Sequence, residues 1–288
     1  MIKLIAKILK KFLPIFLYLK LKKIYEIIKP VNYDLSKDLN YNENLFKLLK
    51  FDIEKIKSQL NSLDFQYHTL GLSWHYHLFV GLKDYFGKKK INILEIGTHN
   101  GNFSNFISKL YDESHITTID LDESDNQFIN TYGREEKEKL DEFLKLRNKN
   151  LNRKNINFIK LNSLNLKRYF NDKKFDLIWV DGDHLNPQVT IDIINSLDLL
   201  NSDGIICTDD VIMDSKFKKG KYLSNEGFFT LKYLEDNGLI NNHYLIKRIG
   251  IINANLKKYV SISTFKNNSK AWHISEIVAS SSTVISAV

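Results

Sequence analysis

Residues 91–104, INILEIGTHNGNFS, decide how the rest of this 288-residue chain is interpreted. The apolar run 91–96 is typical of a buried parallel strand. A turn bounded by Gly97 and Gly101 follows, and helical spacing begins at about Asn102. Glycine lets a backbone turn sharply and approach a ligand, and the free N–H groups of the next helix point back at that ligand. The stretch therefore predicts a cradle for a small molecule.

Strand-like and helix-like segments alternate after the cradle. The expected strands are 91–96, 115–120, 156–161, 175–181, 204–210, 243–249 and 258–264. The expected helices between them are 123–150, 164–170, 187–200 and 226–237. This alternation predicts an α/β fold with a doubly wound, mostly parallel seven-stranded sheet. No helix separates the last two strands, which predicts an antiparallel hairpin at one edge.

The region before the cradle, residues 31–90, is interpreted as a linker and a helical cap. Residues 31–44 are polar and rich in asparagine, which predicts the linker, and 44–63 have helical apolar spacing. Ser73 is placed to cap an aromatic helix that covers the sheet. His75 and His77 are two residues apart and cannot share a helix face, which argues against a metal-binding pair.

The net charge of +8 is concentrated at the N-terminus. Residues 1–30 contain eight lysines and one acid, Glu26, so the other 258 residues carry only +1. We therefore expect no nucleic-acid surface on the body. The single cysteine, Cys207, excludes an intrachain disulfide framework, fits a reducing, cytoplasmic compartment and is expected in the core.

Residues 1–30 predict a basic amphipathic helical extension, which Pro14 kinks or divides. Their longest uncharged run, 12–19, has eight residues, whereas a spanning helix needs roughly 20. Two uses stay open. The segment lies on an anionic membrane surface, as a peripheral contact at the inner face, or it packs on the body or on a second subunit of a homo-oligomer. The tail 266–288 is low in charge, and its pattern indicates no role.

The glycine spacing limits the choice of ligand. A dinucleotide site needs G-x-G-x-x-G, but no glycine stands between Gly97 and Gly101, and no P-loop lysine follows. Glu95, near the end of the first strand, suits a ligand with an ammonium group. Asp120 ends the second strand, 19 residues after Gly101, where an acid can bind a ribose diol. The alternative for Asp120 is a helix N-cap or a solvated acid.

Four motifs at successive strand ends, LEIGTHNG, TTIDLD, FDLIWVDGDH and IICTDDV, resemble those of class I S-adenosylmethionine-dependent methyltransferases. The resemblance covers about residues 90–265, so we place the methyltransferase domain at 91–265. It implies that the methionine part of the donor is held by Glu95, Gly97, Thr98 and Gly101. It further implies that Asp120 binds the ribose hydroxyls and that Asn162 and Ser163 lie near the adenine.

Four aspartates end two strands that are expected to be neighbours: Asp181, Asp183, Asp209 and Asp210. The carboxyl ends of parallel strands meet at one edge of a sheet, where ligands bind. Carboxylates gathered there repel one another unless a cation intervenes, and Mg²⁺ suits such oxygen ligands. The local alternative is that Asp183 caps the next helix and that Asp209 and Asp210 form an Asx turn.

The spacing of these acids is similar to that of metal-dependent O-methyltransferases of the catechol type, and more so of the macrocin type. Asp209 follows Asp181 by 28 residues, and Asp210 comes next. The resemblance implies that Asp181, Asp209 and Asp210 bind Mg²⁺. Where the catechol type has a lysine base, this chain has His184. The resemblance to the macrocin type implies Asp183 as the base, with His184 ranked second.

We therefore expect a Mg²⁺-dependent O-methyltransferase that acts on a vicinal hydroxyl of a sugar or glycoside, in a surface polysaccharide or a natural product. The metal lowers the pKa of the hydroxyl, the base removes its proton, and the oxygen attacks the sulfonium methyl group in line. Two alternatives stay open: a metal-independent small-molecule methyltransferase, and a non-catalytic, membrane-associated partner in glycan assembly.

Overall fold

A computed structural model describes residues 35–63, 73–87, 89–132, 134–249 and 256–266. Its seven strands form one sheet in the order β3-β2-β1-β4-β5-β7-β6. They are β1 (Asn92–Ile96), β2 (His115–Asp120), β3 (Ile156–Lys160), β4 (Phe175–Val180), β5 (Leu200–Val211), β6 (Ile240–Ile246) and β7 (Tyr259–Phe265). Only β7 runs antiparallel to its neighbours, β5 and β6. The predicted fold class and the terminal hairpin are confirmed.

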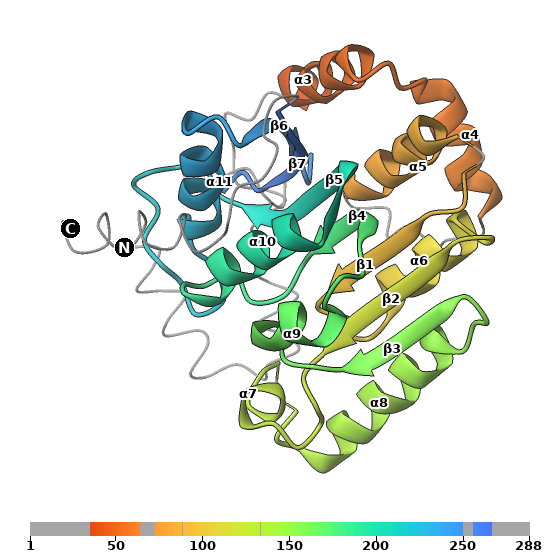
Figure 1. The fold of residues 1–288 in the computed structure, drawn as a ribbon, viewed down its shortest axis with the longest axis vertical. Helices are drawn as coiled ribbons and strands as arrows, with labels where there is room; N and C mark the ends of the chain where they lie inside the picture. The colour runs from red at the N-terminus through yellow and green to blue at the C-terminus, as the bar shows by residue number, and fades with distance from the viewer. Residues whose placement is uncertain (1–34, 64–72, 88, 133, 250–255, 267–288) are drawn as a thin grey trace, which may run out of the picture.

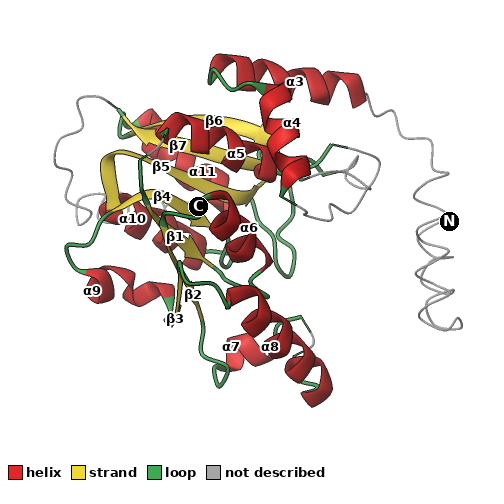
Figure 2. Cartoon of the chain, turned by 90° about the vertical axis from the view of Figure 1, so that its right-hand side faces the viewer, coloured by secondary structure: helices red, strands yellow, loops and turns green. Residues whose placement is uncertain are grey.

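Helices cover both faces of this sheet (Figures 1 and 2). One face carries α4 (Ile53–Ser62), α5 (His75–Phe86), α6 (Asn102–Leu110) and, beside α6, α8 (Lys137–Leu151). The other face carries α9 (Leu166–Phe170), which follows the short helix η1 (Ser163–Asn165), and then α10 (Gln188–Leu199) and α11 (Glu226–Asp236). The central strands are therefore buried on both sides, which explains their continuous apolar runs.

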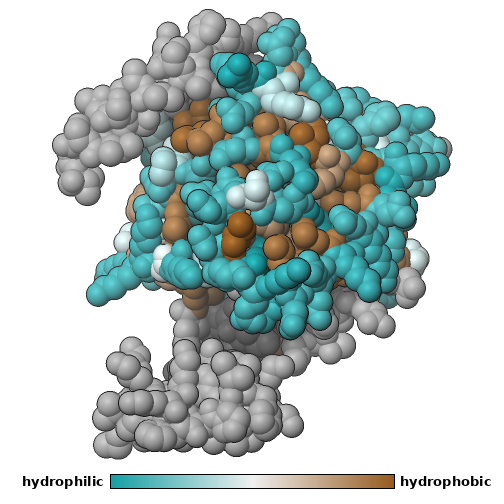
Figure 3. Space-filling model, turned by 90° about the horizontal axis from the view of Figure 1, so that it is seen from below, coloured by the Kyte–Doolittle hydropathy of each residue, from teal (hydrophilic) through white to brown (hydrophobic). Residues whose placement is uncertain are grey.

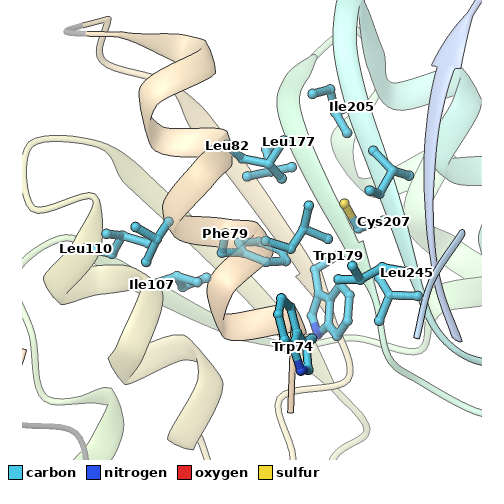
Figure 4. Close-up of a cluster of buried hydrophobic side chains, with 14 of the residues drawn as sticks. Trp74, Phe79, Leu82, Ile107, Leu110, Leu177, Trp179, Ile205, Cys207 and Leu245 are labelled. Carbon is cyan, nitrogen blue, oxygen red and sulfur yellow. The ribbon is translucent and has the colours of Figure 1, made fainter. Parts of the chain in front are cut away.

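The aromatic face of α5 fills the core above the central strands (Figure 4). Phe79 is fully buried and meets Trp179 of β4 edge to face, with ring centroids 5.3 Å apart. Burying one large apolar side chain stabilises a fold by roughly 1.5–3 kcal/mol. Cys207 of β5 lies in the same cluster, as expected, and burial raises the pKa of its thiol.

Residues 35–44 are not a linker, and this part of the prediction was wrong. They belong to α3 (Leu35–Leu48), which lies against the β6 edge of the sheet. Asn42 is buried, and its amide both donates to Ile246 O and accepts from Ile246 N, each at 2.9 Å. The asparagine-rich composition suggested a solvated segment, but here an asparagine satisfies the free backbone groups of an edge strand.

Two predicted helices are each divided in two. The helix expected over 44–63 is split because α3 ends at Leu48 and α4 begins after Asp52, whose carboxylate accepts from Lys55 N at 3.0 Å. The region 123–150 contains α7 (Asn126–Ile129), capped by Asp125, and then α8. Asp52 and Asp125 satisfy the first free N–H groups of α4 and α7, whereas α8 begins after Glu136 without a side-chain cap.

The predicted segments 1–30 and 267–288 lie outside the described residues. Among the helices that the structure describes, none is both long and apolar enough to cross a lipid bilayer. Figure 3 shows one face of the molecule, on which hydrophobic residues are scattered among hydrophilic ones.

Candidate active site

The predicted cradle is formed where β1 turns into α6. Gly97 has a φ of 97° and Gly101 a φ of 72°, both in the region that favours glycine. A Cβ on Gly97 would lie 2.1 Å from the backbone oxygen of Asp181, so no larger residue fits without a shift. The turn therefore requires glycine for its dihedral angle and for its close contact with the end of β4.

Asp120 fixes the cradle turn to the end of β2. Its Oδ2 accepts a hydrogen bond from His99 N and its Oδ1 one from Leu121 N, both at 2.8 Å. Burial raises the pKa of this carboxyl, although the two N–H donors oppose the rise. Each carboxylate oxygen can accept more than one hydrogen bond. A ribose diol can thus still be bound, and that role stays a prediction.

Glu95 lies beneath the cradle. Its side chain is fully buried, and its Oε2 accepts from the hydroxyls of Ser104 and Thr118. The Thr98 hydroxyl bonds the same Thr118 hydroxyl at 2.7 Å. Burial raises the pKa of Glu95 to about 7. These contacts stabilise the turn from below, and direct contact of Glu95 or Thr98 with the donor stays a prediction.

Asn162 and Ser163 follow β3 at the start of η1. Asn162 caps this helix, because its Oδ1 accepts from Leu164 N at 3.0 Å. The Ser163 hydroxyl accepts from Gln188 Nε2 of α10 at 2.7 Å. Both side chains are half-buried. Their place beside the adenine stays a prediction.

The structure brings three of the expected acids together with His184. Asp181, His184 and Asp209 each offer a ligand atom, and these atoms all lie within 4.8 Å of one another. The His184 Nε2 is 3.6 Å from Asp181 Oδ1 and 3.9 Å from Asp210 Oδ2. We call Asp181, His184, Asp209 and Asp210 the acid cluster.

Asp183 lies outside the acid cluster. Its side chain is exposed, and its Oδ1 accepts from Leu185 N at 3.0 Å. Asp183 therefore forms an Asx turn, and it does not cap α10, which begins after Pro187 without a side-chain cap. The geometry therefore favours His184 over Asp183 as the residue that faces a reacting group.

Two lysines complete the cluster, and neither was predicted from the sequence. Lys247 Nζ is bonded to Asp209 Oδ2 and, at 2.7 Å, to Asp210 Oδ1, while Lys258 Nζ is bonded to Asp210 Oδ2. Lys247 directly follows β6 and Lys258 directly precedes β7, so both lysines come from the β6–β7 hairpin. The one signal was Lys247 itself, which directly follows the apolar residues 244–246 inside the segment expected as strand 243–249.

The electrostatics of the cluster follow from these contacts. Burial, and then the charge of Asp209, raise the pKa of Asp181 well above its ordinary value. Burial would also raise the pKa of Asp210, but Lys247, His184 and Lys258 outweigh it and the pKa falls. Burial lowers the pKa of His184. His184 is therefore held toward its neutral form, which can accept a proton.

The cradle and the acid cluster adjoin each other. Asp181 N donates to Ile96 O at 2.9 Å, across the β1–β4 pair. Gly97 packs directly on the backbone of Asp181. A molecule seated in the cradle therefore lies next to whatever the acid cluster binds. The arrangement suits a reaction between two ligands at the carboxyl edge of the sheet.

Comparisons with known proteins indicate the class of protein to which a cradle beside an acid cluster belongs. Residues 94–211, from β1 through β5, match the family model described as a methyltransferase domain. No curated protein sequence matches the chain. The seven-stranded fold, the motifs at its strand ends and this match are consistent with a class I S-adenosylmethionine-dependent methyltransferase.

Several proteins of solved structure resemble this chain in fold. The O-methyltransferase from Bacillus cereus in complex with SAH is 16% identical, covers 81% of this chain and 100% of its own, and has a TM-score of 0.46. TomG, an O-methyltransferase from Streptomyces achromogenes involved in tomaymycin synthesis, is 13% identical over 81% and 99%, with a TM-score of 0.45. The ribosomal protein L11 methylase from Lactobacillus delbrueckii subsp. bulgaricus is 17% identical over 71% and 91%, with a TM-score of 0.42.

Proposed function

We propose that this methyltransferase transfers the methyl group to a hydroxyl oxygen, and that a divalent cation such as Mg²⁺ assists. The observation that carries the proposal is the contact between Gly97 of the cradle and Asp181 of the acid cluster. It sets the donor site beside a group of carboxylates and a histidine. An alcohol is a weak nucleophile at neutral pH, and such a group can position and activate it.

The residues of the acid cluster fit a hard divalent cation. The Oδ1 atom of Asp209 is buried and has no hydrogen-bond partner, which is costly unless another ligand binds it. Three carboxylates face two lysines, so one negative charge is uncompensated when all are ionised. Asp181, Asp209 and Asp210 would hold the cation, which when bound supplies the positive charge that lowers the pKa of an acceptor hydroxyl.

His184 is our choice for the group that removes the proton. Its Nε2 faces the carboxylates, and burial holds its pKa below the ordinary value. Ser224 Oγ donates to the backbone oxygen of His184 at 2.7 Å, which helps to fix the segment. The cradle and Asp120 orient the donor methyl group toward the acceptor oxygen, and alignment of this kind supplies much of the rate.

The acceptor that we propose is a vicinal diol of a sugar or glycoside. Support comes from the resemblance of the acid spacing to the macrocin type. The test is methyl transfer from S-adenosylmethionine to methyl glycosides, with and without EDTA, followed by Mg²⁺ add-back. We expect activity to fall at least 100-fold in EDTA and to return with Mg²⁺. Full activity in EDTA would refute the cation.

Lys247 favours one alternative, a methyltransferase that needs no metal. Its ammonium group already neutralises oxygens of Asp209 and Asp210. In that case activity survives EDTA, and Lys247→Met abolishes it. In the cation-dependent case, Lys247→Met leaves the activity dependent on Mg²⁺.

We infer a cytoplasmic location, with residues 1–30 bound to an anionic membrane surface or to protein. Their eight lysines and apolar spacing support either use. Deleting residues 1–30 and measuring sedimentation with phosphatidylglycerol vesicles separates the two. Membrane binding predicts loss of co-sedimentation, and unchanged binding would contradict it.

A further inference from the structure

The loop between β5 and α11 concentrates positive charge. Its segment 214–222, DSKFKKGKY, has four lysines and one acid. All four lysine side chains are exposed. Since residues 31–288 carry only +1 in total, the rest of the body is slightly acidic. We call Lys216, Lys218, Lys219 and Lys221 the lysine loop.

The lysine loop borders the active site. Tyr222, next to Lys221, stacks on Tyr132 from the segment after α7, with centroids 5.1 Å apart and planes at 27°. Tyr132 in turn meets His99 of the cradle edge to face, with ring centroids 5.4 Å apart, and burial, and then Asp181 and Asp210, raise its pKa. On its other side, the loop is tied to His184 by the Ser224 hydrogen bond.

Two of the lysines are available for a ligand. Lys219 lies 3.6 Å from Glu226, and the Lys221 Nζ lies 4.9 Å from the centroid of the Tyr222 ring. Lys216 and Lys218 form no ion pair with any residue that the structure describes. Four ammonium groups in one loop repel one another, so an anion between them would be stabilised.

There is also room for the body of a ligand at the root of the loop. A cleft of about 350 Å³ opens where β5 ends and β7 begins. It is lined by Met213, Asp214, Leu256, Lys257 and Tyr259. Lys258, beside this cleft in the chain, contacts Asp210 of the acid cluster. The cleft and the acid cluster therefore both adjoin the short segment that leads into β7.

We propose that the acceptor carries a phosphate or diphosphate group, as in a sugar phosphate or a nucleoside diphosphate sugar, and that Lys216 and Lys218 bind it. The sulfonium of the donor is positively charged, so lysine ammonium groups would repel it. The acceptor must present a hydroxyl to the acid cluster and an anion to the lysine loop. Lysine ammonium groups bind phosphate as point charges. This inference rests on the proposed function, because the hydroxyl is the group methylated.

The test measures binding of inorganic pyrophosphate by calorimetry at low salt, in EDTA so that no metal complex forms. The variant is Lys216→Gln/Lys218→Gln. The control is Lys145→Gln/Lys149→Gln, which removes the same charge from exposed positions of α8. We expect the loop variant to bind at least fivefold more weakly than the wild type, and the control to match the wild type. Absence of wild-type binding, or an equal loss in both variants, would overturn the proposal.

Binding of S-adenosylhomocysteine to the same samples separates this proposal from the proposed function. It should be equal in the wild type and both variants, because none of the four substituted lysines belongs to the cradle. If pyrophosphate binds through the loop but S-adenosylhomocysteine binds to none of the proteins, the lysine loop is confirmed as an anion site and the proposed function fails. If only S-adenosylhomocysteine binds, the phosphate-bearing acceptor is refuted.

Discussion

Gly97→Ala perturbs the contact on which the site depends. The alanine Cβ would lie 2.1 Å from the backbone oxygen and 2.6 Å from the carbonyl carbon of Asp181. Ordinary contact begins near 3.4 Å, so the ends of β1 and β4 must separate by about 1 Å. The φ of 97° adds strain of roughly 1–2 kcal/mol, and overpacking adds about 1–3 kcal/mol.

We therefore expect Gly97→Ala to lower the free energy of unfolding by roughly 2–5 kcal/mol. A misplacement of about 1 Å between donor and acceptor can cost on the order of 100-fold in rate. Urea denaturation gives the stability. Calorimetry with S-adenosylhomocysteine and single-turnover methyl transfer give the effect on the site.

Gly238→Ala is the matched control. Gly238 also has a positive φ, 75°, but an added Cβ would meet nothing within 4 Å. In the Gly238→Ala variant, backbone strain should lower the free energy of unfolding by only about 1–2 kcal/mol, and the affinity for S-adenosylhomocysteine should not change. If the two variants are equally stable and Gly97→Ala binds S-adenosylhomocysteine within twofold of the wild type, the close contact does not organise the site.

Three further outcomes follow from individual side chains. Glu95 has a pKa of about 7 in the fold against 4.5 unfolded, so ionising its carboxyl destabilises the fold increasingly as pH rises through that window. Glu95→Gln should therefore be more stable than the wild type at pH 8, by up to roughly 3 kcal/mol of unfolding free energy. In urea titrations this advantage should disappear near pH 4.5. His184→Asn should lower the rate of methyl transfer by about 10²–10⁴. Asp183→Asn can keep its Asx turn, so its rate should stay within threefold of the wild-type rate. The reverse order of effects would make Asp183 the base. Phe79→Ala should lower the free energy of unfolding by about 3–5 kcal/mol. The side chain of Phe229 is 48% exposed, so Phe229→Ala should lower it by less than about 1 kcal/mol. Similar losses in the two variants would contradict the assigned core.

The centre of the sheet could be predicted because its strands are short runs of apolar and β-branched residues that end at glycine or aspartate, as β1 does at Gly97, β2 at Asp120 and β4 at Asp181. Their alternation with helices is a local signal, and it gave all seven strands. Residues 35–44 were misassigned because asparagine in sequence indicates solvation, while Asn42 is buried by a long-range pairing with Ile246. A contact across some 200 residues leaves no trace in local composition.

The acid cluster was only partly predictable, for a geometric reason. Parallel strands bring their carboxyl ends together, so Asp181, Asp209 and Asp210 could be grouped from sequence alone. Whether Asp183 or His184 faces that group depends on the turn after β4. Lys247 enters from the β6–β7 hairpin, whose position beside β5 no motif records.

The most direct measurement is a crystal structure with S-adenosylhomocysteine and Mn²⁺, using anomalous scattering to locate the metal. We expect S-adenosylhomocysteine in the cradle between Gly97 and Asp120. We also expect one anomalous peak at coordination distance from Asp181 and Asp209, with Lys247 moved off Asp209. A structure with the donor product bound, no peak in the acid cluster and Lys247 still paired with Asp209 and Asp210 would contradict this expectation.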